Sequence, residues 1–242
     1  MFYGSQIQKH FNTVQQELQK KLNILFKDVT TIQLSGRTDR HVHATYQVAN
    51  FNSANFIEKN KLIAFFKKNY SGISIHDVQM VSKSFHARRS ASLREYNYKF
   101  TLDEIPNYLH NYLSSYGNTF NINQFQSCLN MIIGKHDFVA FANRGSNHLT
   151  TERTLFYAKI TKYEYKLLTD PKKTIIIYNV CIRGNAFLYR MIRNIIGSIF
   201  QILDPKNSLK ESDFQNLVIN KSRSFNFKPA NPNGLYLTKV NY

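Results

Sequence analysis

The segment Ser35-Gly-Arg-Thr-Asp-Arg-His-Val-His-Ala44 is the stretch from which the fold of this chain can be worked out. It follows a short apolar strand pattern and leads into residues 42–51, where apolar and polar residues alternate as in a half-buried strand. Asp39 therefore lies in a tight connection between Arg37 and Arg40. Neighbouring guanidiniums favour an ionised carboxylate, so Asp39 is a candidate base or nucleophile. A turn aspartate that caps its own backbone is the alternative interpretation.

Helical and strand patterns are mixed along the rest of the chain. Apolar residues at helical spacing predict helices at residues 13–26, 56–70, 124–133 and 188–203, and after Ser208. Alternation predicts further strands at residues 75–81, 96–102, 154–165, 174–183 and 235–240. Thr13 with Gln16, and Ser208 with Glu211, resemble helix-capping pairs. Because helices do not separate every pair of strands, we expect an α+β fold with mostly antiparallel sheets flanked by helices.

The patterns are interrupted at residues 103–116, which contain a proline and several asparagines. We therefore expect two similar α+β subdomains. The N-terminal one, residues 1–104, carries Asp39, and the C-terminal one comprises residues 105–242. The chain has 242 residues, of which 43% are hydrophobic, and this is enough to form a sizeable core.

The charge balance points to a polyanionic partner. Lys and Arg number 32 against 15 Asp and Glu, which gives a net charge of +17 and a pI near 9.8. Nucleic acid is the commonest partner of so basic a protein, although a lysine-rich proteome from an AT-rich genome explains part of the excess. No apolar run approaches the roughly 20 residues of a membrane span, and the N-terminus lacks a signal-peptide pattern. We expect a cytoplasmic protein without a membrane partner.

Motif absences exclude several classes of enzyme. The chain has no GxxxxGK[ST] loop and no GxGxxG after a strand, so we expect no nucleotide cofactor. HExxH and GxSxG are also absent. His41 and His43 share one strand face and could bind a metal, but no third ligand is evident nearby, and we expect no metal. Cys128 and Cys181 have apolar neighbours and are interpreted as small core side chains.

Residues 36–44, GRTDRHVHA, closely resemble the GRTDxGVHA segment of TruA-type tRNA pseudouridine synthases. Further segments resemble that family in its order and near its spacing. They are Phe85-His-Ala-Arg88, Arg94-Glu-Tyr-Asn-Tyr98, His136-Asp-Phe138, Asn185-Ala-Phe-Leu188, Met191-Ile-Arg-Asn194 and Gly234-Leu-Tyr-Leu237. The resemblance spans essentially the whole chain. It implies a cofactor-independent isomerase that converts uridine to pseudouridine at positions 38 to 40 of the tRNA anticodon arm and acts as a homodimer.

The resemblance also implies roles for three residues. Asp39 would act as nucleophile or base on a uridine swung out of the RNA stack. Tyr96 would stack on that base or take part in proton transfer, and Arg193 would pair with Asp39. From the residues alone, an ordinary strand aromatic is the preferred interpretation of Tyr96, since Tyr98 and Phe100 share its face. Arg193 would otherwise belong to a solvated helix face.

Five further residues are expected to bind the RNA substrate. They are Arg37, Arg40, His43, Arg88 and Arg94. Guanidinium groups suit phosphate oxygens, and Arg37 and Arg88 lie inside matched segments. For His43, a structural hydrogen bond explains its presence at least as well as an RNA contact.

Two features depart from the family pattern. His41 stands where the family has Gly, so a positive φ at this position would strain the backbone. Residues 2–8 resemble a segment that normally follows an initial strand, so we expect a sheet to lack one member and to expose an edge. Two other functions stay open: a basic RNA-binding protein without catalysis, and a pseudouridine synthase that acts on other RNA sites.

Overall fold

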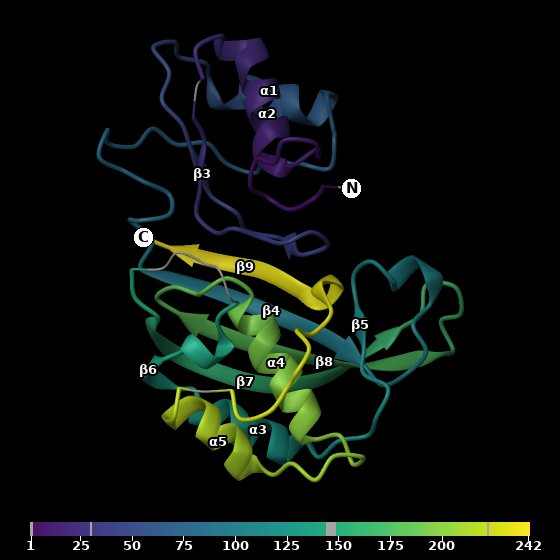
Figure 1. Ribbon diagram of the computed structural model, residues 1–242. Helices are drawn as coiled ribbons and strands as arrows, with labels where there is room; N and C mark the ends of the chain where they lie inside the picture. Colours follow the sequence, from purple (N-terminus) through teal and green to yellow (C-terminus); the bar gives the residue numbers. More distant parts are fainter. Residues whose placement is uncertain (1, 30, 144–148, 222) are drawn as a thin grey trace. The chain divides into compact units, whose positions relative to one another are not determined.

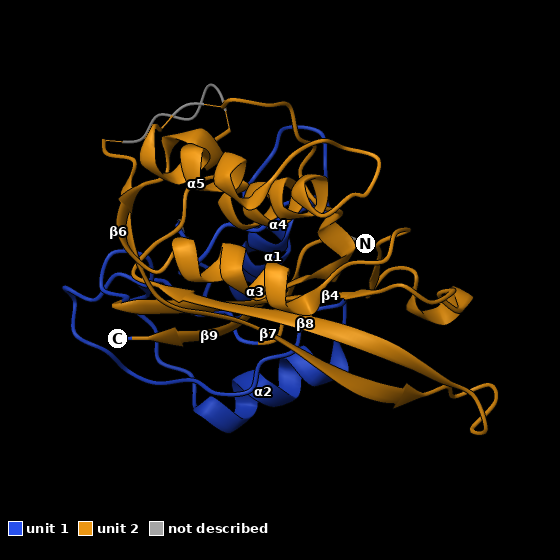
Figure 2. Cartoon of the chain, turned by 90° about the horizontal axis from the view of Figure 1, so that it is seen from below, with its two compact units in different colours: residues 1–41, 46–91, 242 blue, residues 42–45, 92–241 orange. Residues whose placement is uncertain are grey.

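The computed structural model forms two compact units (Figures 1 and 2). The residues that it describes are 2–29, 31–143, 149–221 and 223–242. Unit 1 comprises residues 1–41, 46–91 and 242, and unit 2 comprises residues 42–45 and 92–241. The units adjoin in sequence between Ala91 and Ser92, whereas the subdomain boundary expected after residue 104 stays a prediction. Mixed helices and mostly antiparallel strands confirm the α+β fold class.

Unit 1 contains two helices and a two-stranded antiparallel sheet. Its elements are α1 (Val14–Phe26), α2 (Lys59–Lys68), β1 (Gln33–Leu34) and β3 (Ala49–Asn50). A capping box begins α1: the Thr13 side chain accepts from the backbone N–H of Gln16, and the Gln16 Oε1 accepts from that of Thr13 at 3.1 Å. Each bond satisfies a backbone donor that the first helical turn leaves unpaired. The predicted start of this helix is confirmed.

The core of unit 1 joins α1 to α2. Buried side chains of both helices pack with those of the segment around β1, namely Leu18, Leu22, Phe26, Val29, Ile32, Leu34, Leu62 and Phe66. Lys21 is buried among them, and its Nζ donates to the backbone carbonyl of Asn69, the C-cap residue of α2. Its ammonium also lies 5.6 Å from the centre of the Phe66 ring. The buried cation therefore satisfies a carbonyl that the helix end leaves without a partner.

One predicted strand is wrong in part, and another is wrong as a whole. The strand expected at residues 42–51 is split into β2 (His43–Ala44), which pairs in unit 2, and β3, which pairs in unit 1. Residues 45–48 between them are irregular. The segment 75–81 forms no strand in the described structure, because Ile75 and Val78 pack their side chains on the unit 1 core without a pairing partner for the backbone.

Unit 2 is built on a seven-stranded sheet with the order β2-β9-β4-β8-β7-β6, and β5 pairs with β4. The strands are β4 (Leu93–Thr101), β5 (Ser114–Ser115), β6 (Gly134–Asp137), β7 (Glu152–Lys166), β8 (Thr174–Gly184) and β9 (Leu235–Asn241). The β2–β9 and β4–β5 pairs are parallel, and the other pairs are antiparallel. Short 3₁₀ helices are Asn107–Leu109, Val139–Phe141 and Pro232–Gly234.

Helices of the same unit lie together on one side of this sheet (Figure 2). They are α3 (Ile122–Met131), α4 (Met191–Ile202) and α5 (Glu211–Ile219). The helix predicted from residue 188 begins later, because Arg190 is left-handed with φ 59°. The predicted Ser208–Glu211 cap of α5 is also wrong: the Lys210 backbone N–H donates to Asp213 at 2.8 Å instead. No helix among the described residues has both the length and the apolar character needed to cross a bilayer.

Strand β4 separates an aromatic face from a polar face, as its alternating sequence predicts. Tyr96, Tyr98 and Phe100 are buried on one face. The Phe100 ring contacts Phe200 of α4 at 5.0 Å and Phe125 of α3 at 6.0 Å between ring centroids. The core of unit 2 is therefore a packed layer of aromatic rings between the sheet and the helices.

The opposite face of β4 carries a network of hydrogen bonds. Arg183 on β8 donates from Nε to Glu95 at 2.6 Å, and Thr238 on β9 donates to the same carboxylate at 2.9 Å. Asn97 donates to Thr238 at 2.7 Å and accepts from Asn179 at 2.8 Å. These side chains join three neighbouring strands, so the polar face contributes specific cross-strand pairing.

The two cysteines are thiols. Burial raises the pKa of Cys128 on α3 to about 12 and that of Cys181 on β8 to about 11. Both are therefore protonated at neutral pH and poorly reactive. Cys128 is fully buried, which confirms its interpretation as a core side chain, and Cys181 is half-buried.

Glu95 makes stability depend on pH. Burial raises its pKa, but hydrogen bonds from Arg183, Thr238 and Asn97 outweigh that effect and hold the pKa below its ordinary value. A lowered carboxyl pKa stabilises the fold above the unfolded value of about 4.3, and this contribution is lost as the pH falls through the folded value. We expect Glu95→Gln to lower the free energy of unfolding at pH 7, and the difference from wild type to shrink below about pH 4. Urea denaturation over this pH range measures it.

Glu164→Gln, on an exposed position of β7, is the control. It should leave the free energy of unfolding near the wild-type value throughout. A Glu95→Gln difference of constant size at every pH would contradict the stabilising role of the ionised carboxylate.

Candidate active site

The loop of residues 35–41 carries Asp39 in unit 1, and its first residues are held by one side chain. Gln47 accepts from the backbone N–H of Gly36 at 3.1 Å and donates from Nε2 to the Gly36 carbonyl at 2.8 Å. The Ser35 hydroxyl donates to the same Gln47 oxygen at 2.6 Å. Both backbone groups of Gly36 are thereby satisfied without a strand partner, so Gln47 fixes where the loop leaves β1.

The N-terminal segment holds the middle of the same loop. Ser5 accepts from the backbone N–H of Thr38 at 2.8 Å through its hydroxyl and donates from its own N–H to the Thr38 carbonyl at 3.0 Å. Gly4 has φ +91°, and a Cβ there would lie 2.9 Å from the Thr38 carbonyl oxygen. Only glycine allows this approach. The half-buried Asp39 thus directly follows a stretch of backbone that Gln47 and Ser5 hold at Gly36 and Thr38.

The arginines beside Asp39 are exposed. The Arg40 guanidinium lies 4.2 Å from the centre of the Tyr3 ring, which stacks on Phe11 at 4.5 Å. This cation–π contact restricts the direction of Arg40 while leaving its charge at the surface. Arg37 and Arg40 both therefore offer exposed positive charge near Asp39, and their contact with RNA stays a prediction.

Arg88 belongs to a tight turn in unit 1. The His86 Nδ1 accepts from the backbone N–H of Arg88 at 3.1 Å, and Asn50 accepts from that of Ala87 at 2.8 Å. The Tyr242 hydroxyl donates to the Ala87 carbonyl at 2.9 Å. The turn thus fixes the backbone from which the exposed Arg88 side chain extends.

Tyr96 and Tyr98 share a face of β4 but have different environments. The Tyr96 ring meets Phe187 edge-on at 5.2 Å between centroids, and 7% of the residue is exposed. Tyr98 is fully buried and donates its hydroxyl to Ser114 at 2.9 Å. Burial raises the pKa of Tyr98, and the Ser114 bond and the charge of Arg193 only partly offset this. Tyr98 therefore stays protonated and serves the core.

Arg193 lies in the first turn of α4, where a neighbouring segment holds it. Its Nε donates to the Ala230 carbonyl at 2.8 Å, and its own carbonyl accepts from the Ala230 N–H at 2.8 Å. Residues 228–230 can lie this close because α4 has Gly197, where a Cβ would collide with the Lys228 carbonyl. The bond from Nε restricts the orientation of the guanidinium, and the backbone bond joins the Ala230 segment to α4.

Near each charged candidate, Asp39 and Arg193, one residue has a left-handed backbone conformation. His41, two positions after Asp39, has φ +67°, and Arg190, three positions before Arg193, has φ +59°. This conformation is unfavourable for residues with a Cβ. The positive φ considered for His41 is therefore confirmed, and His41 carries the strain that the family's glycine avoids.

Two residues that were expected to contact RNA have hydrogen-bond partners within the protein. The His43 Nε2 donates to the Asn111 carbonyl at 2.7 Å, and its ring stacks on Tyr236 at 4.8 Å. Arg94 is 7% exposed and donates from Nη1 to the Asn185 carbonyl at 2.8 Å. These bonds give both residues a role in holding unit 2 together. Their contact with RNA stays a prediction.

Unit 2 carries Tyr96 and Arg193, and unit 1 carries Asp39, so the pairing of Asp39 with Arg193 stays a prediction. Sequence reasoning missed Ser5, Gln47 and Ala230. Only Gln47 had a signal, as a polar residue within an expected strand. Within the described ranges, no three His, Cys, Asp or Glu side chains gather as metal ligands would.

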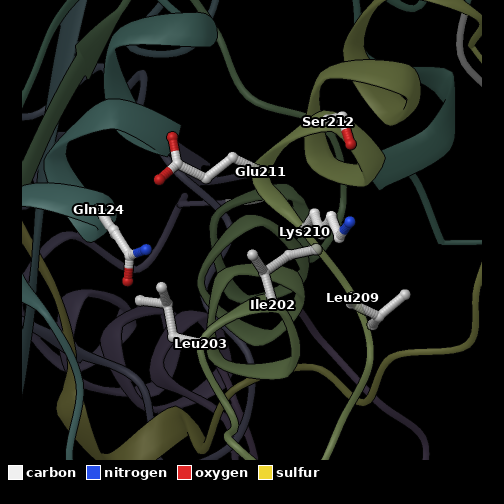
Figure 3. A pocket seen from close by; sticks show the side chains of 7 residues that line it. All are labelled: Gln124, Ile202, Leu203, Leu209, Lys210, Glu211 and Ser212. Carbon is white, nitrogen blue, oxygen red and sulfur yellow. The ribbon is translucent and has the colours of Figure 1, made fainter.

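A hollow of about 350 Å³ lies elsewhere in unit 2, between the end of α4 and the start of α5 (Figure 3). Ile202, Leu203, Lys210 and Glu211 are among its lining residues. None of the predicted site residues lines it. We therefore assign it no part in the candidate site.

Comparisons with known proteins cover the whole chain. A family model described as tRNA pseudouridine synthase matches residues 129–242. The tRNA pseudouridine synthase A 1 of Bacillus cereus is 32% identical over 247 residues, which cover all of this chain and 94% of the relative. The tRNA pseudouridine synthase A of a Geobacillus species is 34% identical over 248 residues, with 100% and 93% covered. That of a Thermoanaerobacter species is 33% identical, with 100% and 94% covered.

The close approach of residues 228–230 to Gly197 of α4 leads to a prediction about stability. Gly197→Ala places a methyl group against the Lys228 carbonyl and displaces the segment that holds Arg193. We expect the free energy of unfolding to fall by about 1–3 kcal/mol, as is typical of overpacking. Gly117→Ala is the control, because a Cβ there has no heavy atom within 4 Å. Thermal and urea denaturation compare the two, and equal stabilities would contradict the close approach.

Proposed function

Because this chain belongs to the tRNA pseudouridine synthase A family, we propose that it isomerises uridine to pseudouridine in tRNA with Asp39 as the catalytic residue. The observation that carries the assignment of Asp39 is the loop that presents it. Gln47 and Ser5 bond to the backbone of Gly36 and Thr38, in the stretch that directly precedes this carboxylate. Such preorganisation is typical of catalytic groups, whereas a turn aspartate of no function needs no such support.

The reaction breaks the bond between uracil N1 and ribose C1′ and forms a bond between uracil C5 and the same C1′. A proton leaves C5 and N1 gains one, so the product is an isomer and no oxidant or reductant is consumed. The uridine must leave the RNA stack to be reached. Asp39 then acts as nucleophile or base at the detached uracil or its sugar.

The residues of unit 2 have complementary proposed roles. Tyr96 stacks on the flipped base, and its ring direction is set by Phe187. Of the two tyrosines on this face, Tyr96 is the one suited to proton transfer, because the Tyr98 hydroxyl is committed to Ser114 and its pKa is raised. Arg193 pairs with Asp39 and orients it, and the bond from Nε to the Ala230 carbonyl restricts the orientation of the guanidinium.

The RNA substrate is bound mainly by positive charge. Arg37, Arg40 and Arg88 are exposed in unit 1, and the net charge of +17 favours a polyanion throughout. Arg94 and His43 make the proposed RNA contacts of unit 2. The proposed target is the anticodon arm at positions 38 to 40, and the proposed enzyme is a cytoplasmic homodimer. Family resemblance supports these finer assignments.

Replacement of Asp39 tests the catalyst. We expect Asp39→Asn to form no pseudouridine in tRNA transcripts while tRNA binding stays within a few-fold of wild type, because the fold and the basic surface remain. The product is mapped by position in each transcript. Asp77→Asn, which breaks an exposed ion pair with Lys59 in the same unit, is the control and should keep full activity.

Each result has a clear meaning. Product from Asp39→Asn at the wild-type rate would remove Asp39 from the mechanism. No product from wild-type protein that binds tRNA would instead favour a binding protein without catalysis, and product outside the anticodon arm would favour a synthase for other RNA sites.

Replacement of Arg88 tests the phosphate contact. Loss of one such contact weakens tRNA binding uniformly and lowers the slope of log affinity against log salt by about 0.7–0.9. We expect Arg88→Gln to raise KM and leave kcat within about twofold, because the contact is the same in the ground and transition states. Binding titrations at several salt concentrations, with Arg88→Lys as the charge-preserving control, measure this. An unchanged salt slope would place Arg88 outside the RNA-binding surface.

A further inference from the structure

The first residues of the chain bring two aromatic rings onto the loop that contains Asp39. Gly4 packs directly on this loop, since a Cβ there would lie 3.4 Å from both the Asp39 carbonyl carbon and the Arg40 backbone nitrogen. The Tyr3 side chain, next to Gly4, reaches the guanidinium of Arg40. The chain then turns back, so that the Phe11 ring stacks on the Tyr3 ring. Tyr3 and Phe11 are therefore fixed to the surface beside Arg40.

The two rings and the guanidinium form one group with accessible surface. The Tyr3 and Phe11 centroids lie 4.5 Å apart with 22° between the ring planes, and the Arg40 Cζ lies 4.2 Å from the Tyr3 centroid. Tyr3 is half-buried beneath these neighbours, whereas Arg40 is exposed and 46% of Phe11 is exposed. The group thus presents a flat ring and a planar cation to solvent, where a ligand can reach both.

The chemistry of this surface matches a nucleobase. None of the three side chains belongs to the hydrophobic core of unit 1, so the group is not needed to complete that core. Bases stack on aromatic rings and on guanidinium planes in RNA-binding proteins. Residues 2–12 contain one lysine and no acidic residue, so the surrounding charge favours a ligand that is joined to phosphates. An apolar peptide would match the rings but not the charge.

We propose that Tyr3, Phe11 and Arg40 form a stacking platform for an unpaired base of the tRNA substrate. The platform lies on the loop of Asp39, so the base that it holds is close to the uridine that reacts. Movement of that uridine out of the RNA stack uncovers one face of an adjacent base, and the platform replaces the lost contact. This inference rests on the proposed function, which supplies the identity of the RNA.

Two substitutions in the full chain remove flat surface and preserve the other properties of the side chain. Phe11→Leu keeps an apolar group without a ring, and Arg40→Lys keeps the charge without the guanidinium plane. We expect each variant to bind a tRNA transcript about five- to tenfold more weakly, because stacking of one base contributes about five- to hundredfold to affinity. KM should rise in proportion, with kcat within about twofold of wild type. Phe11→Trp, which restores a flat ring, should bind at least as tightly as wild type.

The matched control is Phe56→Leu, at an aromatic residue of unit 1 that is 72% exposed and lies outside the platform. It should bind tRNA as wild type does. If Phe11→Leu lowers Tm, Arg40→Lys decides the matter, because it changes only an exposed side chain. If both platform variants bind and react as wild type does, the inference is overturned while the proposed function stands. If wild type binds tRNA but forms no pseudouridine, the proposed function fails, and the binding losses still decide on the platform.

The salt dependence of binding separates stacking from a phosphate contact. Phe11→Leu and Arg40→Lys should keep the wild-type slope of log affinity against log salt, because neither loses an ionic contact. Normal binding by Arg40→Lys, together with a lower slope for Arg40→Gln, would make Arg40 a phosphate contact and overturn the platform.

Synthetic anticodon arms identify the base. Each arm carries an abasic nucleotide at one position near the target uridine. At the position that meets the platform, the abasic arm should bind wild type about five- to tenfold more weakly than the intact arm does, and should bind Phe11→Leu without further loss. Losses of equal size in the two proteins at every position would mean that no base meets Phe11, and the inference would be overturned.

Discussion

The hydrogen bonds between side chains and backbone around Asp39 are the constraint on which the candidate site depends. A loop outside any sheet ladder must find partners for its N–H and C=O groups elsewhere. Gln47 satisfies both backbone groups of Gly36, and Ser5 satisfies both of Thr38. A short carboxylate on such a loop is positioned largely by the main chain that carries it.

In unit 2 the charged candidate lies on a helix, α4, and a neighbouring chain segment holds it. Arg193 is fixed through Ala230, whose segment approaches α4 only because Gly197 has no side chain. In each unit a left-handed residue adjoins the charged candidate, His41 beside Asp39 and Arg190 before Arg193. Strain of this kind is maintained only where the surrounding contacts determine the backbone. Both charged groups therefore sit on backbones that are held by more than local propensity.

The side chains of strand β4 differ in role between and within its two faces. Tyr98 and Phe100 belong to the aromatic layer, and burial keeps the Tyr98 hydroxyl protonated. Tyr96 lies on the same face but meets the edge of Phe187 and retains some exposure. The opposite face is joined by the Glu95–Arg183 pair and its neighbours. One alternating strand thus supports the fold on both sides, and Tyr96 is the residue of its aromatic face that we propose stacks on the substrate.

The sequence by itself determined the fold class, the family and several local features. The capping box at Thr13 and the alternation of β4 follow from residue types within a few positions of each other, and the positive φ considered at His41 came from the family's glycine at that position. Tertiary structure alone decided the division of residues 42–51 between two sheets, and it alone gave Gln47, Ser5 and Ala230 their roles. It also gave Arg94 and His43 structural partners. These outcomes depend on hydrogen bonds between residues far apart in the chain, and periodicity reports which side of an element is buried but not which partner it meets.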